Sequence, residues 1–197
     1  TGTLSRVALR AFDQDDVTLD VTADALEQEG DALTLTGNVR GETADGIALS
    51  SDAMTWRTDE RRLESGWTLL NWGEDELAAE AFAYDARREQ ATLTGVRATL
   101  RRNETFVLTS ERGEVSRDRV FFAGTVEIAS NDQTLGADEL ETDSDGDVVT
   151  LRGNVAASGP QVELRADSLV LAPDGQTARG NVSVDVIVAA EEEERGT

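Results

Sequence analysis

The 197-residue chain contains no cysteine, no histidine and no lysine, and it has only two prolines and one methionine. Without cysteine it can form no disulfide and has no thiolate nucleophile. Without histidine it lacks the commonest general base. It also has no Gly-x-Ser-x-Gly motif and no phosphate loop ending in lysine. Paired carboxylates, as in glycoside hydrolases, are the one catalytic arrangement left, and we expect a protein that is not an enzyme.

Acidic residues outnumber basic ones, with 40 Asp and Glu against 18 bases, all of them arginine. The net charge of −22 argues against binding to nucleic acid or to an anionic membrane surface. No segment approaches the ~20 consecutive apolar residues of a membrane-spanning helix.

Six glycines recur at a near-constant interval: Gly37, Gly66, Gly95, Gly124, Gly153 and Gly180. The interval is 29 residues four times and then 27. Three of these glycines begin a Gly-Asn-Val tripeptide, whereas Gly66 is followed by Trp67. Self-similarity at a fixed period of this size indicates a stack of equivalent supersecondary units.

A second ladder has the pattern apolar, any residue, Ala or Ser, then Asp or Glu. Its acids are 27 to 31 residues apart: Asp24, Asp52, Glu80, Glu111, Asp138 and Asp167. We interpret the acids as formers of bends and turns, and the Gly-Asn pairs as residues that satisfy turn or bulge geometry. Because both ladders run through nearly the whole chain, we expect one elongated unit.

Alternation of apolar and polar residues with period two predicts strands through most of the chain. Turn chemistry separates the runs at Asp45-Gly46, Asp145-Gly146 and Pro173-Asp174-Gly175. Residues 74 to 90 are rich in Ala, Glu and Arg and favour a helix by propensity, but the repeat places them on the strand template, which we follow. About two strands a repeat gives roughly a dozen in an antiparallel meander.

Each repeat contains a change of phase. The apolar positions are even at Leu164 and Ala166 and odd at Leu169 and Leu171. Such a change predicts a β-bulge or bend at one place in every repeat. Bends in register would fold a long sheet along its length, so that its inner faces meet as an apolar trough. The sequence leaves open whether this trough is accessible or closed as a core.

The Gly-Asn-Val strand end, followed about ten residues later by apolar-x-Ala-Asp-x-Leu, resembles the OstA-like repeat of the periplasmic lipopolysaccharide-transport proteins of the LptA/LptC family. The resemblance covers about residues 17 to 186 and is closest in Asp147 to Leu171 and in Val17 to Trp56. It implies an all-β, half-open antiparallel β-jellyroll, or β-taco, of about twelve strands. Gly113 departs from the pattern because it replaces a large apolar residue.

The resemblance also implies a function: a non-enzymatic carrier in the periplasmic bridge that moves lipopolysaccharide from an inner-membrane ABC transporter to the outer membrane. The implied partners are lipopolysaccharide, that transporter complex and other Lpt-type β-jellyroll proteins joined through edge strands, with no nucleic acid and no cofactor. The implied location is the periplasm, either free or anchored to the inner membrane by a segment preceding Thr1.

Position on the repeat predicts which side chains would face the lipid. These are the apolar residues of the acid-bearing strands: Leu49, Met54, Trp56, Leu77, Phe82, Leu108, Val115, Leu135, Leu140, Leu164, Leu169 and Leu171. Each of them is equally compatible with a place in the core. The predicted organisation is an N-terminal extension or first strand at 1–16, the repeat domain at 17–188 and an acidic disordered tail at 189–197.

Two other interpretations of the sequence concern a metal site and a different function. Residues 143 to 147, with the sequence Asp-Ser-Asp-Gly-Asp, resemble the start of a calcium loop, but the twelfth position is Asn154 and not a bidentate glutamate. We interpret them as a hairpin turn and expect no metal. The alternative function is a structural or adhesive β-solenoid at the cell surface that carries no lipid, in which stacked rows of side chains would close the core.

Overall fold

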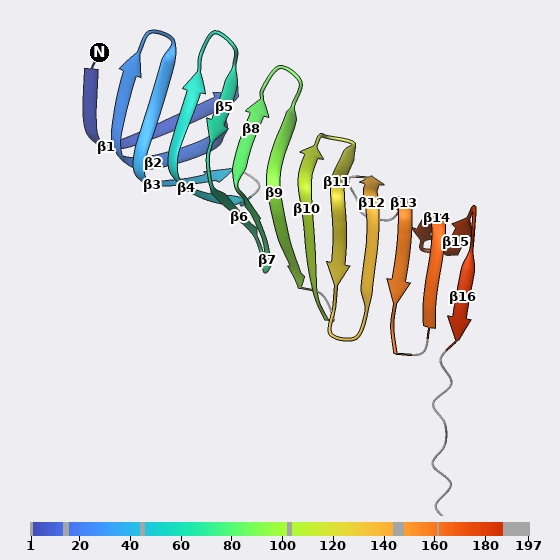
Figure 1. Ribbon diagram of the computed structural model, residues 1–197. Helices are drawn as coiled ribbons and strands as arrows, with labels where there is room; N and C mark the ends of the chain where they lie inside the picture. The colour runs from blue at the N-terminus through green and yellow to red at the C-terminus, as the bar shows by residue number, and fades with distance from the viewer. Residues whose placement is uncertain are drawn as a thin grey trace, which may run out of the picture.

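The computed structural model describes residues 2–13, 16–43, 46–101, 104–143, 148–160 and 162–186. These residues form one antiparallel sheet of sixteen strands and contain no helix (Figure 1). The strands are β1 (Gly2–Asp13), β2 (Asp16–Glu29), β3 (Ala32–Thr43), β4 (Ala48–Arg57), β5 (Arg62–Ser65), β6 (Thr68–Trp72), β7 (Asp75–Ala79), β8 (Ala81–Asp85), β9 (Gln90–Arg101), β10 (Thr105–Val115), β11 (Arg119–Ala129), β12 (Thr134–Asp143), β13 (Val149–Ser158), β14 (Val162–Ala172), β15 (Gly175–Arg179) and β16 (Ser183–Val186).

The all-β, repeat-built class is therefore confirmed, and the segment with helical propensity forms β7, β8 and the turn after them. The count of about twelve strands was too low. Three of the long strands are broken in two: β5 and β6 both pair with β4, β7 and β8 both pair with β9, and β15 and β16 both pair with β14. Counted by position in the sheet, the sixteen strands occupy thirteen rows, and the breaks fall at residues 66–67, 80 and 180–182.

Bulges of the predicted kind are present in three glycine strands, β3, β11 and β13, which carry the extra residue, whereas β9 pairs with β10 without a register shift at Gly95. Arg152 pairs with Ser168 and Val155 with Ala166, so β13 has one residue more than β14 over this interval. Gly153 and Asn154 there have left-handed φ angles of 72° and 49°. Four residues of β13 thus span the same distance as three of β14, which explains why the change of phase appears only in the acid-bearing sequence. The same shifts occur in β3 and β11.

The acid and glycine ladders meet at these bends, along a line across the sheet that we call the crease. A Cβ on the crease glycine would collide with the neighbouring acid side chain in five pairs: Asp24–Gly37, Glu80–Gly95, Glu111–Gly124, Asp138–Gly153 and Asp167–Gly180. The asparagine after the glycine donates its side-chain N–H to the same carboxylate, at 2.7 Å from Asn38 to Asp24 and 2.9 Å from Asn154 to Asp138. The acids therefore hold the bends, as the sequence indicated.

The second repeat is built differently. Gly66 has no atom near its missing Cβ, and the chain breaks between β5 and β6. The buried Ser51 hydroxyl instead lies 2.8 Å from the Trp67 carbonyl oxygen, and the Thr68 hydroxyl donates to the Gly66 carbonyl at 3.1 Å. Trp67 itself is half exposed.

The crease divides the sheet into two limbs. One limb contains β6, β7 and β16, the other contains β5, β8 and β15, and the long strands contribute to both. The N-terminal strands, blue in Figure 1, change direction sharply partway along their length. The inner faces of the limbs bury two apolar clusters, one centred on Val39 and Met54 and the other running from Leu77 to Leu169.

Small side chains line the inner side of the crease and let the limbs approach. Acid strands place Ala or Ser there, and most glycine strands place Val, all of them buried: Ala23, Val39, Ser51, Ala79, Val96, Ser110, Val126, Ala137, Val155 and Ala166. Gly113 is a second kind of small position. A Cβ there would lie 3.1 Å from the Phe122 ring, so the missing side chain leaves room for that ring.

Candidate functional site

A groove of about 860 Å³ lies between the two limbs in the C-terminal half of the sheet. One wall comes from the limb that contains β16, with Leu108, Ile128, Leu135, Ala157 and Leu164. The opposite wall comes from the other limb, with Val149, Leu169, Leu171 and Gln176. Its volume is within the usual range for small-molecule sites, and its lining is mostly aliphatic.

Short side chains explain why space remains here. Ala157 of β13 occupies the inner-face position that Ile128 occupies two strands earlier, and both pair with Leu135. On the other limb, Ala178 of β15 pairs with Leu169, so the row of large side chains ends there. Protein interiors are otherwise packed to crystal-like density, so shortened residues on both walls leave unfilled volume.

The groove contains no charged residue among those that line it, although 29 % of the chain is charged. Its polar lining residues are all neutral: Ser130, Gln133, Thr134, Ser158 and Gln176. Thr134 and Ser158 pair with each other beside Leu135 and Ala157, so their side chains lie on the opposite face of the sheet. A concave, mostly apolar surface with a few neutral polar groups binds hydrocarbon without specific chemistry at the ligand.

Exposed apolar residues extend the groove toward the last strands. Val162, at one end of the groove, is 43 % exposed, and Val184 of β16 is 53 % exposed. Val184 pairs with Leu164 and therefore shares its face of the sheet. The apolar lining thus continues onto the C-terminal edge, which is open to solvent.

Five of the twelve predicted lipid-facing residues line this groove: Leu108, Leu135, Leu164, Leu169 and Leu171. Met54, Leu77, Phe82 and Leu140 are buried in the closed part of the inner face. Leu49, Trp56 and Val115 are partly buried on the inner face outside the groove. The trough is therefore closed by packing over much of its length and accessible toward the C-terminus.

The prediction omitted the groove residues that come from glycine strands, above all Ile128, Ala157 and Val149. Ile128 and Ala157 each stand four residues after a crease glycine, at Gly124 and Gly153. That fixed offset was a usable signal. The prediction missed these residues because it took the lipid-facing positions from the acid ladder alone.

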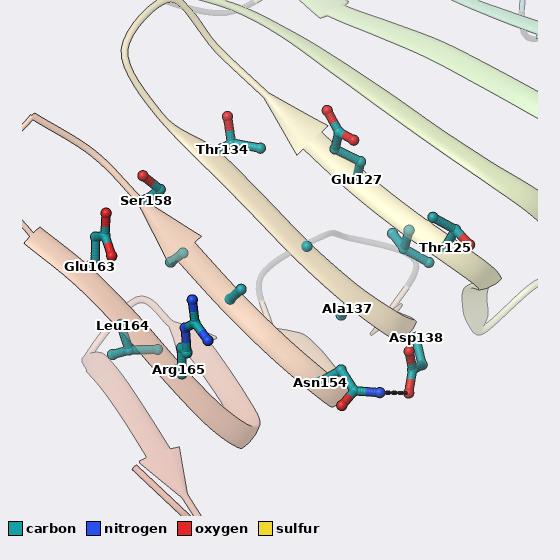
Figure 2. A pocket seen from close by; sticks show the side chains of 14 residues that line it. Thr125, Glu127, Thr134, Ala137, Asp138, Asn154, Ser158, Glu163, Leu164 and Arg165 are labelled. Atoms are coloured by element: carbon teal, nitrogen blue, oxygen red, sulfur yellow. Dashed lines mark hydrogen bonds between the residues drawn. The ribbon is translucent and has the colours of Figure 1, made fainter. Parts of the chain in front are cut away.

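A second hollow, of about 420 Å³, lies over β11 to β14 near the crease. It forms where Gly136 and Ala156 carry little or no side chain on adjacent strands. Figure 2 shows Glu127, Thr134, Ser158, Glu163 and Arg165 standing around it, with the Asn154–Asp138 hydrogen bond at one end. In contrast to the groove, this hollow is bordered by charged and exposed side chains.

Groups with displaced pKa values lie away from the groove. Hydrogen bonds from the backbone N–H groups of Arg87 and Arg88 lower the pKa of Asp85, although its burial acts in the opposite sense. Partial burial raises the pKa of Tyr84.

Within the described residues, no group of three or more acidic side chains converges as a metal site would. Of the calcium-like segment at 143–147, only Asp143 lies within the described residues. The predicted tail at 189–197 lies entirely outside them.

The structure has no helix, within its described ranges, that is long and apolar enough to cross a membrane. A scan against protein-family models found no match for this chain, and a search of curated proteins also found none.

Proposed function

We propose that this protein is a non-enzymatic lipid carrier that holds acyl chains in the groove between its limbs. The observation that carries the proposal is an accessible aliphatic groove without a charged residue in a chain of net charge −22. A core exists to exclude water, whereas this volume is left unfilled and continues onto an exposed apolar edge. Hydrocarbon chains gain about 0.8 kcal/mol for each methylene that they bury.

The resemblance to the OstA-like repeat makes lipopolysaccharide the proposed cargo and the periplasm the proposed location. It also supports a place in a bridge from an inner-membrane ABC transporter to the outer membrane. The sheet is compatible with such a bridge because it is open, with β1 at one edge and β15 and β16 at the other. Edge strands of this kind can pair with a strand of a neighbouring β-jellyroll protein.

Site-specific photo-crosslinking tests the proposal. A benzoyl-phenylalanine probe at Leu135 or Leu171 faces the groove, and a probe at the exposed Arg152 on the outer face is the matched control. We expect adducts with lipopolysaccharide at the two groove positions and none at Arg152, in protein whose circular dichroism shows an intact sheet. A folded protein that forms no adduct at either groove position would contradict the carrier function.

A structural or adhesive β-solenoid is the second candidate, and the closed part of the inner face favours it. Val39 and Leu151 are fully buried and Met54 nearly so, as stacked rows of a solenoid core would be. Under this alternative the groove is only incomplete packing at one end of the sheet. Filling it with Ala157→Leu would then stabilise the protein without changing any binding, whereas a carrier would lose lipid.

A further inference from the structure

The charged residues near the groove are acidic, and no basic residue balances them. The loops beside it carry Asp132 and Asp174, near the groove residues Gln133 and Gln176. The backbone oxygen of Asp132 lies 4.0 Å from the Cβ position of Gly159, which lines the groove, so this loop is adjacent to the groove. These acids add to a field that is already strongly negative over the whole molecule.

The arginines closest to the groove in sequence do not offset these acids. Arg101 follows the groove residue Leu100, but its guanidinium donates to the Glu74 carbonyl oxygen. Arg165 follows Leu164, and strand alternation directs it to the other face of the sheet, where it borders the second hollow (Figure 2). No base is therefore among the residues that line the groove.

The polar groups that do line the groove suit an uncharged linkage. Gln133 and Gln176 are exposed amides, and Ser130 supplies a hydroxyl; the Thr134 and Ser158 side chains lie on the opposite face, beside the second hollow (Figure 2). Amides and hydroxyls both donate and accept hydrogen bonds, which fits the carbonyl and hydroxyl groups of an ester or amide linkage. A phosphate is bound in proteins by arginine, lysine or helix N-termini, and none of these lines the groove.

Resting on the proposed carrier function, we propose that the groove selects acyl chains joined to an uncharged linkage, and that it binds an anionic amphiphile well only when salt or a divalent cation screens the acidic surface. Lipopolysaccharide, with its phosphates, would then bind in its cation-neutralised form. The discrimination arises from charge near the groove and not from the hydrocarbon, which both kinds of ligand share.

Two amphiphiles with the same acyl chain, of which one carries a phosphate group, test this directly: monolauroylglycerol and the matching lauroyl-glycerol phosphate. Each is titrated against a neutral fluorescent probe bound to the folded protein, below its micellar concentration. At an ionic strength of about 0.01 M, where the Debye length is ~30 Å, we expect the anionic ligand to bind at least about tenfold more weakly. At about 1 M salt, or with Mg²⁺ added, the difference should shrink to within about threefold.

A pair of variants separates a local effect from one of net charge. Gln176 and Thr177 are adjacent exposed residues of β15; Gln176 pairs with the groove residue Leu171, and Thr177 pairs with Val170 on the other face. Gln176→Arg should improve binding of the anionic ligand several-fold at low salt relative to its effect on the neutral ligand, and this gain should disappear at high salt. Thr177→Arg makes the same change in net charge and should have a much smaller effect.

The outcomes distinguish the two proposals. If both amphiphiles bind equally at low salt, or if Gln176→Arg acts no more strongly than Thr177→Arg, the selectivity is wrong and the carrier function stands. If neither amphiphile displaces the probe at any salt concentration, the carrier function fails as well.

Discussion

At the scale of single residues, the contact between Asp138 and the Gly153-Asn154 pair explains why the repeat combines these three residue types. Glycine is needed because its φ of 72° is left-handed and because its Cβ position is occupied by the Asp138 side chain. Asparagine is needed because it tolerates the next left-handed φ and donates to the same carboxylate. The aspartate, the glycine and the asparagine are therefore required together.

This arrangement predicts a large difference between two glycine substitutions. Gly153→Ala should lower the free energy of unfolding by about 2 kcal/mol or more, because it combines a left-handed φ with a collision against Asp138. Gly136→Ala is the control, since the nearest atom to its Cβ is 3.9 Å away and its φ is not left-handed; its change should stay within about 0.5 kcal/mol.

Urea denaturation measures both values. Equal effects of the two substitutions would show that the crease contact contributes nothing of its own. The double variant Gly153→Ala with Asp138→Ala should recover part of the loss, because it removes the collision while keeping the strained φ.

At the scale of strands, some rows cross the crease as one strand and others are broken there. β13 is continuous, and its bulge is held by Asp138 and Asn154. The row formed by β5 and β6 is interrupted at Gly66, which has no such contact, but the row formed by β15 and β16 is interrupted at Gly180 although Asn181 donates to Asp167, so the contact alone does not keep a row continuous. The long strands have ten or more residues, whereas β5 to β8 have four or five.

Amide hydrogen exchange should follow this difference. Short strands that end at a break can open locally without disturbing a whole row, so β5 to β8 should exchange faster than β11 to β13. The comparison is internal, because all seven strands belong to one sheet and one sample. Uniform protection across these strands would mean that the breaks at Gly66 and Glu80 do not weaken the sheet.

At the scale of the whole molecule, charge works against compactness. The crease adds a carboxylate on every second row, and rows in a sheet are about 5 Å apart, so successive crease acids are roughly 10 Å from one another. That spacing is near the Debye length at about 0.1 M salt. The crease therefore concentrates like charge along one line of a protein whose net charge is already −22.

We therefore expect the melting temperature to rise between about 0.05 and 1 M sodium chloride, since salt screens this repulsion. Asp52→Asn is an informative variant, because the glycine of its repeat, Gly66, lies outside the reach of any side chain at its Cβ position. It should raise the melting temperature at low salt more than at high salt. A melting temperature independent of salt in the wild-type protein would contradict the argument.

Periodicity in the sequence was sufficient to predict the fold, because a period-two alternation and a 29-residue repeat are properties of local spacing. The bulge was predicted from the shift between Ala166 and Leu169, yet its extra residue is on the partner strand, which keeps its own parity from Leu151 to Val155. Sequence spacing within one strand cannot show which of two paired strands is longer.

The candidate site was less predictable for a different reason. Leu77 and Leu164 stand at the same position of the repeat, three residues before the acid, but Leu77 is buried by its neighbours and Leu164 lines the groove. The difference depends on Ala157 and Ala178, which lie on other strands and are too short to fill the space between the limbs. Whether a residue is accessible depends on the combined volume of the side chains that face it from both limbs. These side chains come from several repeats, so the sequence of one repeat does not determine it.

The strict alternation of carboxylate strands and glycine strands limits how the gene for such a chain can change in length. Loss of one strand would place two carboxylate strands about 5 Å apart, with like charges opposed and no glycine to receive either side chain. Loss or duplication of a whole hairpin, close to 29 residues, preserves every contact at the crease. Evolution can therefore lengthen or shorten this molecule only in units of one hairpin, and each added unit joins an inner face that is already built to receive it.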